Sequence, residues 1–486
     1  MKRGSITVFA TLCLLFTASA LLVLSEAARV WGLEQYVEWK GRQSVEYAAA
    51  EYQPYLWEQY HILSFDGGRG STQFEAGTLT GEVMHAAESR NGRGTDLFGA
   101  ELTHIYEPEY LLLTDQDGEI FISLVTSYMK QNLPKEVLEA LYEKYQKAGD
   151  TQVENPEYED VEASIETAEN GLQEARKAAE AEERPVPAVA ENPLETAGSI
   201  RESMRDSLLA ALLPEGAKLP TEQLPVEEAL ENRVLEEGNS YCESSYGVQE
   251  RILAAQYAGS VFPCYGKEDG EQAVTCALEY LVGGKATGQE NLEAAVKRLL
   301  LGRTAANVTV ILSDPEKMEQ VYVVTTALAG FAVDPFLHKA VKIAVVGAWA
   351  FLESVQDVRA LLDGGKIALL KDRSEWTMEL SGIGDAISGT RRAKECVNGW
   401  TYEEYLTQML TGMDGRTLAY RMMDLMEWNL RRLEGCSDCR MDHMMTAYSY
   451  RMQFEAVPLF SKMSQFFAKG KNAYYFETEK GISYIP

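Results

Sequence analysis

Cysteine and histidine are the residue types of this sequence best suited to redox or metal chemistry, with seven and five copies. Cys436 and Cys439 have the CxxC spacing of redox pairs and of half a zinc site. His443 follows, but there is no second CxxC, and Arg440 stands where a c-type haem motif needs His. We therefore expect a local disulfide between Cys436 and Cys439, or two unpaired thiols, rather than catalysis or zinc binding.

The other cysteines give no further site. Cys13 lies inside a long apolar run near the N-terminus. The six cysteines outside that run allow three disulfides in 15 pairings if this part of the chain is exported. The sequence does not select among these pairings, which involve Cys242, Cys264, Cys276, Cys396, Cys436 and Cys439.

Motifs for nucleotide binding and hydrolysis are absent from the sequence. Gly-Gly-Lys occurs at 283–285 and 364–366 without the first glycine of a phosphate loop, so we expect helix C-caps or turns there. Asp115 and Asp117 lack the remaining ligands of an EF-hand, which favours a plain turn over a calcium loop. The sequence has no HExxH or GxSxG motif, and no GxGxxG after a strand. We predict no catalytic, cofactor-binding or metal-binding residue, no cofactor, and no enzymatic activity.

The charge of the chain excludes one class of partner. With 74 acidic and 45 basic residues, its formal charge is −29. Nucleic-acid binding requires a basic face that neutralises phosphates, so we expect no nucleic-acid partner. Residues 151–240 hold 22 acidic and 7 basic side chains, and six of the 15 prolines lie between Pro185 and Pro225. This composition predicts an acidic, helical and Pro-rich connector.

The N-terminus indicates where the protein resides. Residues 6–24 form a run of 19 uncharged residues that follows Lys2 and Arg3. A bilayer core needs about 20 apolar residues as a helix, so we expect this run to contact the lipid as a single membrane span. The positive-inside rule predicts a cytoplasmic N-terminus and an ectodomain outside the cell membrane. A cleaved signal peptide is the alternative, because Ala-Ser-Ala at 18–20 resembles a cleavage site, but the length of the run favours retention.

The helix is expected to continue beyond the membrane. No proline occurs between residues 27 and 52, and Pro54 is the first strong helix breaker. Small and apolar residues recur there at steps of three and four, at Val30, Leu33, Val37, Gly41, Ser44, Ala48 and Tyr52. We predict one helix from about residue 5 to residue 52, roughly 70 Å long at 1.5 Å per residue. Pilins and pseudopilins are built from a membrane-spanning helix with such an amphipathic continuation.

The first 29 residues resemble a known group. Lys-Arg-Gly-Ser-Ile-Thr-Val-Phe at 2–9, the apolar run and Glu-Ala-Ala-Arg at 26–29 resemble the N-terminus of pilin-like proteins of tight-adherence (Tad/Flp) pilus systems. One departure is Phe9, which stands where type IV prepilins usually carry Glu, five residues after a cleavage glycine at Gly4.

The chain as a whole resembles an uncharacterised family of Gram-positive, mainly clostridial, envelope proteins that share this N-terminus. The stretches that carry this likeness are Tyr-Leu-Trp-Glu-Gln-Tyr at 55–60, Leu-Thr-Asp-Gln-Asp-Gly at 113–118, Leu-Glu-Tyr-Leu-Val-Gly-Gly-Lys at 278–285 and Tyr-Glu-Glu-Tyr-Leu at 402–406. The resemblance implies a structural or assembly role, with envelope or pilus-assembly proteins as partners.

The middle of the chain predicts an α+β, mainly helical fold. Residues 110–113 and 120–122 flank a turn and predict a β-hairpin. Residues 134–183 predict a packed helical hairpin, whose seam consists of Val161, Ile165, Ala168, Leu172, Ala175 and Ala179. The apolar stretches 321–333 and 340–352 are too short and too near charged residues to span a membrane, so we expect buried core helices.

The C-terminal part predicts a helix followed by strands. A capping box at Thr401–Glu404 begins a helix that we expect to reach about residue 434. Alternating apolar residues then predict strands, at Tyr448, Tyr450, Met452 and Phe454, and in the tail at Tyr474, Tyr475, Phe476, Ile482 and Tyr484. We expect these strands to pair with the strand near residue 112 in a small antiparallel sheet.

Together these patterns predict five segments and one function. The segments are a transmembrane anchor with an amphipathic helix (1–60), a mixed α/β segment with a hairpin (61–150), the acidic connector (151–240), a helical core (241–395) and a C-terminal helix with strands (396–486). We expect a membrane-anchored cell-envelope structural or assembly protein. The alternative is an exported enzyme or ligand-binding module whose site is not visible in the sequence.

Overall fold

The chain divides into two units, each assembled from segments that are far apart in the sequence. This computed structural model describes residues 3–88, 98–150, 161–185, 192–214, 216–243, 246–267, 272–332, 334–380, 393–394, 396–460 and 473–485. Unit 1 comprises Met1–Ser127, Val234–Ser245 and Met426–Pro486, and unit 2 comprises Tyr128–Arg233 and Tyr246–Leu425. The fold is mainly helical with one small antiparallel sheet, as predicted. The five sequence segments stay a prediction about chain organisation.

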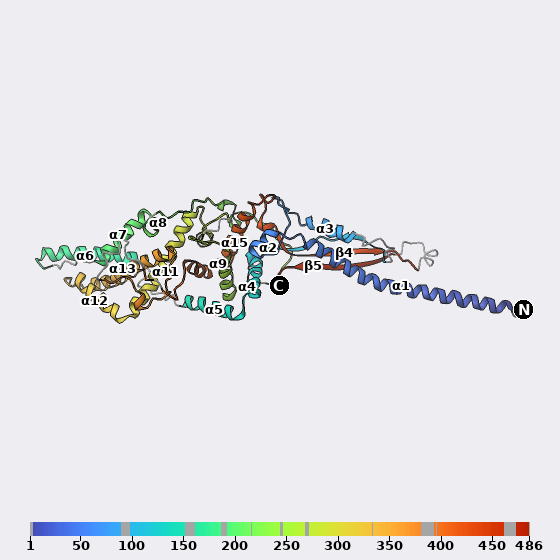
Figure 1. Ribbon diagram of the computed structural model, residues 1–486, viewed down its shortest axis with the longest axis horizontal. Helices are drawn as coiled ribbons and strands as arrows, with labels where there is room; N and C mark the ends of the chain where they lie inside the picture. Colours follow the sequence, from blue (N-terminus) through green and yellow to red (C-terminus); the bar gives the residue numbers. More distant parts are fainter. Residues whose placement is uncertain are drawn as a thin grey trace. The chain divides into compact units, whose positions relative to one another are not determined.

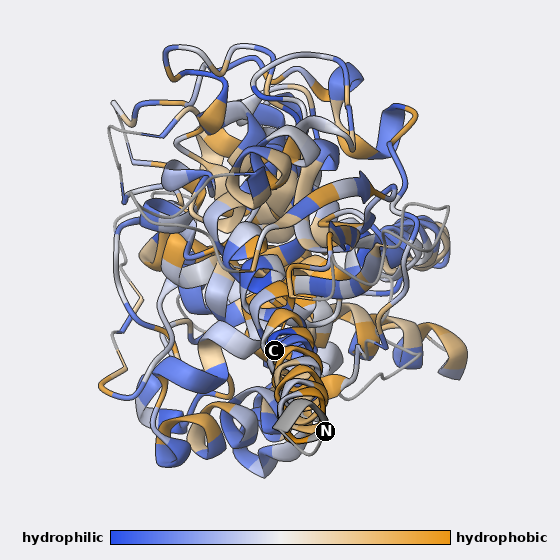
Figure 2. Cartoon of the chain, turned by 90° about the vertical axis from the view of Figure 1, so that its right-hand side faces the viewer, coloured by the Kyte–Doolittle hydropathy of each residue, from blue (hydrophilic) through white to orange (hydrophobic). Residues whose placement is uncertain are grey.

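A single long helix opens unit 1. Helix α1 runs from Arg3 to Ala49, which confirms the predicted unbroken helix (Figure 1). Every side chain from residue 6 to residue 25 is exposed, and Figure 2 shows this half of the helix as predominantly hydrophobic. From Glu26 onward, one face of α1 becomes buried. Leu33, Val37 and Val45 on that face join the core of unit 1.

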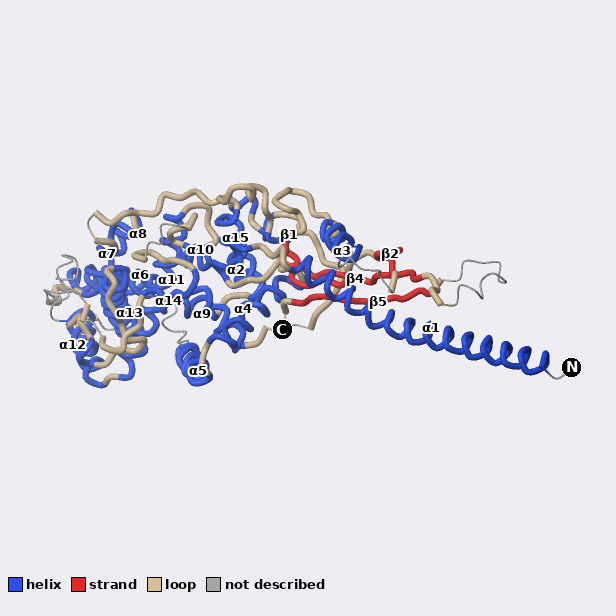
Figure 3. Tube along the Cα trace, turned by 45° about the vertical axis from the view of Figure 1, so that its right-hand side comes forward, coloured by secondary structure: helices blue, strands red, loops and turns tan. Residues whose placement is uncertain are grey.

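The sheet of unit 1 is organised around one strand (Figure 3). Strand β4 (Met444–Ala456) pairs antiparallel with β5 (Tyr474–Ser483) and with the short β1 (Phe65–Asp66). It also pairs antiparallel with β2 (Ala100–Ile105) and β3 (Glu109–Leu112). The predicted pairing near residue 112 is confirmed by the register Leu112 opposite Met445.

One face of this sheet is covered by helices. Tyr448, Tyr450, Met452 and Phe454 alternate along β4 and are buried in the core with residues of α1 and of α3 (Thr78–Glu88). A side chain at Gly41, between Val37 and Val45 of α1, would place its Cβ 2.8 Å from Thr478 Cγ2 of β5. Glycine therefore permits the close approach of α1 to the sheet.

The predicted hairpin at 110–122 is wrong in its second half. Strand β3 is present, but residues 120–122 lie in α4 (Glu119–Asn132) and are buried there. The strand ends at Leu112, and a turn leads into a short 3-10 helix (Gln116–Gly118) with left-handed backbone at Gln116 and Asp117, directly before α4. The Asp115 carboxylate accepts hydrogen bonds from Leu112 N and Gly238 N, so this segment is a turn, as expected.

Unit 2 is a set of packed helices. Their bounds, in chain order, are α5 (Lys135–Asp150), α6 (Val161–Ala181), α7 (Pro193–Asp206), α8 (Leu208–Leu212), α9 (Val248–Val261), α10 (Ala277–Gly283), α11 (Gly288–Ser313), α12 (Pro315–Ala329), α13 (Pro335–Leu362) and α14 (Tyr402–Thr411). Helices α2 (Pro54–Tyr60) and α15 (Gly415–Leu430) complete the α-helices of the described residues.

The predicted helix from 401 to about 434 is two helices. The reciprocal capping box at Thr401 and Glu404 begins α14, as predicted. The helix then ends at Thr411, and the Asp414 carboxylate accepts a hydrogen bond from Thr417 N in the first turn of α15. A local cap therefore divides a stretch whose apolar pattern continues across the break.

Helix α13 is the packing centre of unit 2. Helices α6, α7, α8, α11 and α12 all contact it. The prediction that 340–352 is a buried core helix is confirmed, although the complete helix has 28 residues rather than about 13. The predicted hairpin of 134–183 is wrong, because the seam of α6 packs against α13, whereas α5 packs against α9 and α14. Ile165, Ala168 and Leu172 of that seam are buried, so this face of α6 is part of the core of unit 2.

Candidate functional site

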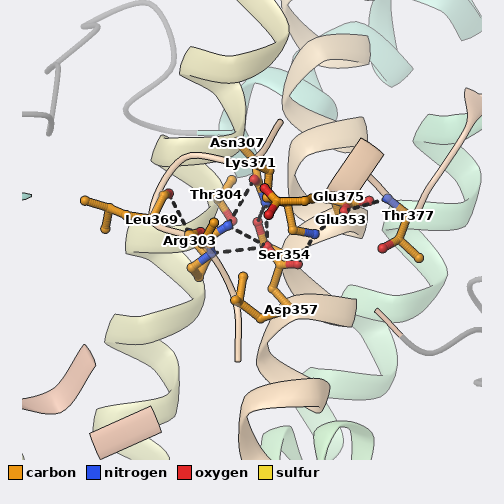
Figure 4. A network of polar contacts seen from close by, with 12 residues as sticks. Arg303, Thr304, Asn307, Glu353, Ser354, Asp357, Leu369, Lys371, Glu375 and Thr377 are labelled. Atoms are coloured by element: carbon orange, nitrogen blue, oxygen red, sulfur yellow. Dashed lines mark hydrogen bonds and ion pairs between the residues drawn. The ribbon is translucent and has the colours of Figure 1, made fainter. Parts of the chain in front are cut away.

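Four charged side chains form a buried cluster within unit 2 (Figure 4). Glu353 and Asp357 lie one turn apart on α13, Arg303 comes from α11, and Lys371 comes from the segment after α13. The Arg303 guanidinium contacts Asp357 Oδ2 through Nε at 3.1 Å and Nη2 at 2.9 Å. Lys371 Nζ forms ion pairs with both carboxylates. We call these four residues the charge cluster.

Further hydrogen bonds surround the charge cluster. The Glu353 carboxylate accepts hydrogen bonds from Thr377 N at 3.0 Å and Met378 N at 2.7 Å. Asn307 Nδ2 donates to Asp357 Oδ2 at 3.1 Å. Arg303 Nη1 donates to the carbonyl oxygens of Ala368 and Leu369. The cluster therefore attaches residues 368–378 to α11 and α13.

The two carboxylates have different electrostatic surroundings. Burial alone would raise the pKa of Asp357, but the adjacent Arg303 and Lys371 charges hold that pKa below its usual range. Burial raises the pKa of Glu353, and the Asp357 charge adds to this effect. All four side chains are at most 1% exposed and carry no net charge together, so the arrangement suits a structural tie better than a site that substrate must reach.

Neighbouring groups extend this polar interior. Lys317 of α12 places its ammonium 3.8 Å from the centroid of the Trp376 ring and 4.9 Å from that of Trp349. Burial lowers the pKa of Lys317 to about 8, while the Glu353 charge opposes that effect. Both indole N–H groups donate to the Met378 carbonyl. The two tryptophan side chains therefore lie between the Lys317 ammonium and the Met378 carbonyl, next to the charge cluster.

A second buried ion pair lies in unit 1, where the apolar half of α1 ends. Glu26 and Arg29 are the first charged residues after the uncharged run, and they contact each other at 3.0 Å. Arg29 donates to the carbonyl oxygens of Phe98 at 2.6 Å and Val457 at 3.1 Å. The Glu26 carboxylate accepts hydrogen bonds from Leu459 N and Phe460 N. The pair therefore joins α1 to the chain before β2 and after β4.

The structure brings the predicted cysteine pair together. Cys436 and Cys439 lie in a turn closed by a 3.1 Å hydrogen bond from Cys439 N to Cys436 O. All seven cysteines lie within the described residues and are free thiols in this structure. The disulfide between Cys436 and Cys439 therefore stays a prediction. His443 lies buried beside Phe74, and in the described part of the chain no group of three or more His, Cys, Asp or Glu is arranged to hold a metal.

The comparison with known families covers more than half of the chain. Residues 185–456 match the family described as "Family of unknown function (DUF5702)". The chain belongs to this family. Neither a curated protein nor a solved structure matches the chain. Membership in DUF5702 agrees with the expected uncharacterised family, and the match includes the charge cluster and the CxxC turn. Helix α1 precedes the matched residues, so the likeness of its sequence to tight-adherence proteins stays a proposal.

The glycine motifs of this DUF5702 chain are turns, as expected. Gly284 follows α10 with a φ of 61°, and Gly364 lies just after α13 with a φ of 86°. These left-handed conformations are typical of helix C-caps, where glycine is favoured. Neither Gly-Gly-Lys sequence therefore forms a phosphate loop.

Sequence reasoning missed the charge cluster of this DUF5702 chain. One signal was present, because Glu353 and Asp357 are four residues apart within a largely apolar stretch. Charges at that spacing on a core helix require buried partners. The partners could not be identified, since Arg303 lies 54 residues away from Asp357 and sequence spacing alone does not relate them.

Another buried acid was missed as well. Glu279 of α10 is fully buried, and its carboxylate accepts a hydrogen bond from Tyr265 N at 2.9 Å. Burial raises the pKa of Glu279 to about 7. Burial and the Glu279 charge also raise the pKa of the Cys264 thiol to about 12 and that of Cys276 above its usual range. These two thiols are therefore poor nucleophiles.

Proposed function

We propose that this protein is a membrane-anchored structural or assembly component of the cell envelope, similar to a pilin-like component of a tight-adherence-type pilus system. Helix α1 carries this proposal. Its first half presents exposed apolar side chains on all sides, and the same helix continues without a break into the packed layer over the sheet. A membrane anchor that is continuous with the ectodomain core fixes the position of that core at the membrane surface.

The limits of the exposed apolar half support a membrane span. Residues 6–24 would extend about 28 Å as a helix, which approaches the ~30 Å thickness of a bilayer core. The helix is long and apolar enough to cross a membrane, and none of that apolar window is buried by protein. Burial begins at Glu26, two residues after Leu24. The protein core therefore starts where the apolar run stops.

An exposed aromatic residue supports the same position of α1 in the membrane. Trp31 is 70% exposed on α1, about 10 Å along the helix beyond Leu24 at 1.5 Å per residue. Tryptophan is enriched at membrane–water interfaces, where its ring and its N–H group are both accommodated. Trp31 would therefore lie at the headgroup level, on the same side of the span as the Glu26–Arg29 pair.

The proposed orientation rests on the basic start of the chain. Arg3 begins α1, and Lys2 lies outside the described residues. With these cations on the cytoplasmic side, the sheet and unit 2 are on the outer side of the membrane. Other envelope or pilus-assembly proteins are the proposed partners of this exposed part.

Deletion of residues 2–24 tests the proposed anchor. The expected result is release of the protein into the soluble fraction. Among the described residues, α13 is the other helix long and apolar enough to cross a membrane, and more than half of its apolar window is buried within its own unit. A shortened protein that floats with membranes would contradict the proposal. The matched control is the full chain with a flexible N-terminal tag, from which the same number of residues is removed. This deletion should leave the protein in the membrane.

Protease treatment of intact cells tests the orientation separately. A tag after residue 486 should be removed from cells that retain a cytoplasmic marker protein. A tag that is protected until the cells are lysed would show the opposite orientation. This outcome would leave the anchor itself intact, so the two parts of the proposal are distinguished.

A further inference from the structure

The turn with Cys436 and Cys439 lies against the start of a neighbouring loop in unit 1. Cys439 Sγ donates a hydrogen bond to Asp66 Oδ2 at 3.5 Å. Asp66 is the last residue of β1, which pairs with the beginning of β4. The Cys439 thiol is thus in contact with a carboxylate from a segment more than 370 residues earlier.

The two thiols have different exposure. Cys439 is 1% exposed, whereas Cys436 is only half-buried and accepts a hydrogen bond from Gln53 Nε2 at 3.8 Å. Burial raises the pKa of Cys439 above its usual range, and its contacts with Cys436 and the Asp66 carboxylate add to this effect. An external oxidant can therefore reach Cys436 more readily than Cys439.

The Asp66 carboxylate is held in position by backbone groups. Its oxygens accept hydrogen bonds from Gly68 N at 2.9 Å and Gly70 N at 2.7 Å. Gly70 has a φ of 78°, and a Cβ at this position would lie 2.5 Å from the Gly435 carbonyl oxygen. The loop that carries Asp66 is therefore packed directly against the residue that precedes Cys436.

We propose that Cys436 and Cys439 are a reversible dithiol–disulfide pair in which Asp66 accepts the proton of Cys439. The turn satisfies the geometric requirement, because residues at the two ends of a β-turn have Cα atoms within about 7 Å and a disulfide spans about 4.4–6.8 Å. The hydrogen bond from Cys439 to Asp66 supplies the path for the proton. This proposal is independent of the orientation of α1 in a membrane.

Oxidation of the two thiols proceeds in two steps. The Cys436 thiol loses its proton to water, and the thiolate attacks a small-molecule or protein disulfide. This attack forms a mixed disulfide and releases one thiolate of the oxidant, which takes up a proton from water. Cys439 then transfers its proton to Asp66, and the resulting thiolate attacks the Cys436 sulfur and displaces the second thiolate. The oxidant disulfide is reduced to two thiols, the protein dithiol is oxidised, and the Asp66 proton passes to water or to the departing thiolate.

Glutathione disulfide and the purified full-length protein in detergent test the assignment of the two thiols. The reaction is quenched with acid, free thiols are alkylated, and the 436–439 peptide is analysed by mass spectrometry. After oxidation, the wild-type peptide should carry no alkyl group and should have a mass two hydrogen atoms below that of the unmodified dithiol. Addition of reduced glutathione should restore both free thiols and their alkylation. In Cys439→Ser, Cys436 should retain glutathione, whereas in Cys436→Ser the buried Cys439 should not acquire it.

Two results would overturn the thiol assignment. One is a wild-type peptide that forms no internal disulfide at any glutathione ratio. The other is a Cys436→Ser protein whose Cys439 reacts with glutathione disulfide as fast as Cys436 does in the wild type. Cys242, a partly exposed cysteine remote in sequence from the pair, serves as the internal reference for reagent access.

Asp66→Asn tests the proton-accepting role of the carboxylate. Loss of the proton acceptor should slow the conversion of the mixed disulfide into the internal disulfide by about a hundredfold, the usual scale of base catalysis. The equilibrium should instead move about tenfold toward the disulfide, because the reduced thiol loses a charged acceptor. A purely structural disturbance would expose Cys439 and would not slow this step.

The matched control is Asp438→Asn, which makes the same change at an exposed carboxylate inside the CxxC turn. This variant should form the disulfide at the wild-type rate and with the wild-type equilibrium. Equal rates for the wild type and Asp66→Asn would refute the role of Asp66. Equal slowing in both variants would also refute it, because the general charge of the turn would then be responsible.

Discussion

Helices α1 and α13 pass the same test of length and apolarity for crossing a membrane, but the protein surrounds them differently. None of the apolar window of α1 is buried, whereas more than half of that of α13 is buried. The two helices also differ in their charges. Glu353 and Asp357 lie inside the packed part of α13, whereas α1 has no charge between residues 6 and 24. Apolar composition therefore does not distinguish a core helix from an anchor. The two are distinguished by how much of the helix the rest of the chain buries.

The comparison also shows what a buried charge requires. On α13, each carboxylate meets a cation from another segment of unit 2. On α1, Glu26 meets Arg29 one turn away and also binds backbone N–H groups after β4. In both helices, the buried charges occur where other parts of the chain are packed against the helix. Such pairs are costly to break, because removal of one partner leaves the other charge buried without compensation.

Asp357→Asn is expected to give the largest loss of stability among these tests. Arg303 and Lys371 would then keep two buried positive charges against the single carboxylate of Glu353. Removal of one partner from a buried pair costs about 3–5 kcal/mol. Urea unfolding of the full chain, followed by tryptophan fluorescence, measures this loss.

Glu316→Gln is the matched control for Asp357→Asn. Glu316 forms an ion pair with Arg373 on the surface of the same unit, where both side chains are more than half exposed. Exposed pairs contribute at most about 1 kcal/mol. Equal effects of the two substitutions on the free energy of unfolding would show that α13 does not depend on its buried charges.

Glu279 predicts a pH dependence of the stability of unit 2. Its folded pKa of about 7 lies above the ordinary value of 4.5, because burial disfavours the ionised form. The folded state therefore binds this proton more tightly than the unfolded state does. The resulting stability is fully present below about pH 4.5 and is lost as the pH rises through 7. On the scale of 1.4 kcal/mol per pH unit, the loss is about 3 kcal/mol.

Unfolding free energies at pH 5 and pH 8 measure this effect. Glu279→Gln should remove most of the difference between the two values, because glutamine does not titrate. Glu293→Gln, at an exposed position of α11, should leave the difference unchanged. The prediction fails if the wild type and Glu279→Gln lose the same stability between pH 5 and pH 8.

A smaller effect is expected where α1 packs on the sheet. Gly41→Ala would bring a Cβ within 2.8 Å of Thr478 Cγ2, and the buried β-branched residue has little freedom to move. We expect a loss of about 1–2 kcal/mol from this overpacking. Gly81→Ala on α3 meets no atom within 4 Å and should gain about 0.5–1 kcal/mol from helix propensity. Thermal unfolding compares the two, and a stabilising Gly41→Ala would show that α1 is not tightly packed on β5.

Local patterns allowed the elements of unit 1 to be predicted where one face is buried. The alternation at Tyr448 to Phe454 predicted β4, because side chains of a strand point alternately to the two faces of a sheet. The absence of a breaker predicted α1. The same kind of pattern was misleading at residues 120–122, because a short apolar run is compatible with both a strand and the first turn of a buried helix.

Partners distant in the sequence could not be predicted from these patterns. The seam of α6 was visible, but nothing in its spacing indicates that α13 is its partner. The CxxC spacing predicted that Cys436 and Cys439 are close, whereas the contact with Asp66 depends on the pairing of β1 with β4. Periodicity identifies which face of an element is buried, and tertiary packing determines what covers it.

The contrast between α1 and α13 is tested most directly by one matched pair of substitutions, Leu15→Arg and Val345→Arg. Leu15 is 59% exposed in the middle of the proposed span, and Val345 is fully buried on α13. Membrane flotation and urea unfolding are measured for both variants. An arginine at the centre of a span weakens insertion by about 2.5–3.5 kcal/mol on translocon scales.

Leu15→Arg should therefore reduce the fraction of protein that floats with membranes and leave the unfolding of unit 2 unchanged. Val345→Arg should leave the protein with the membranes and destabilise unit 2. The reverse result, in which Val345→Arg releases the protein from the membrane and Leu15→Arg does not, would contradict the assignment of α1 as the anchor and α13 as a core helix.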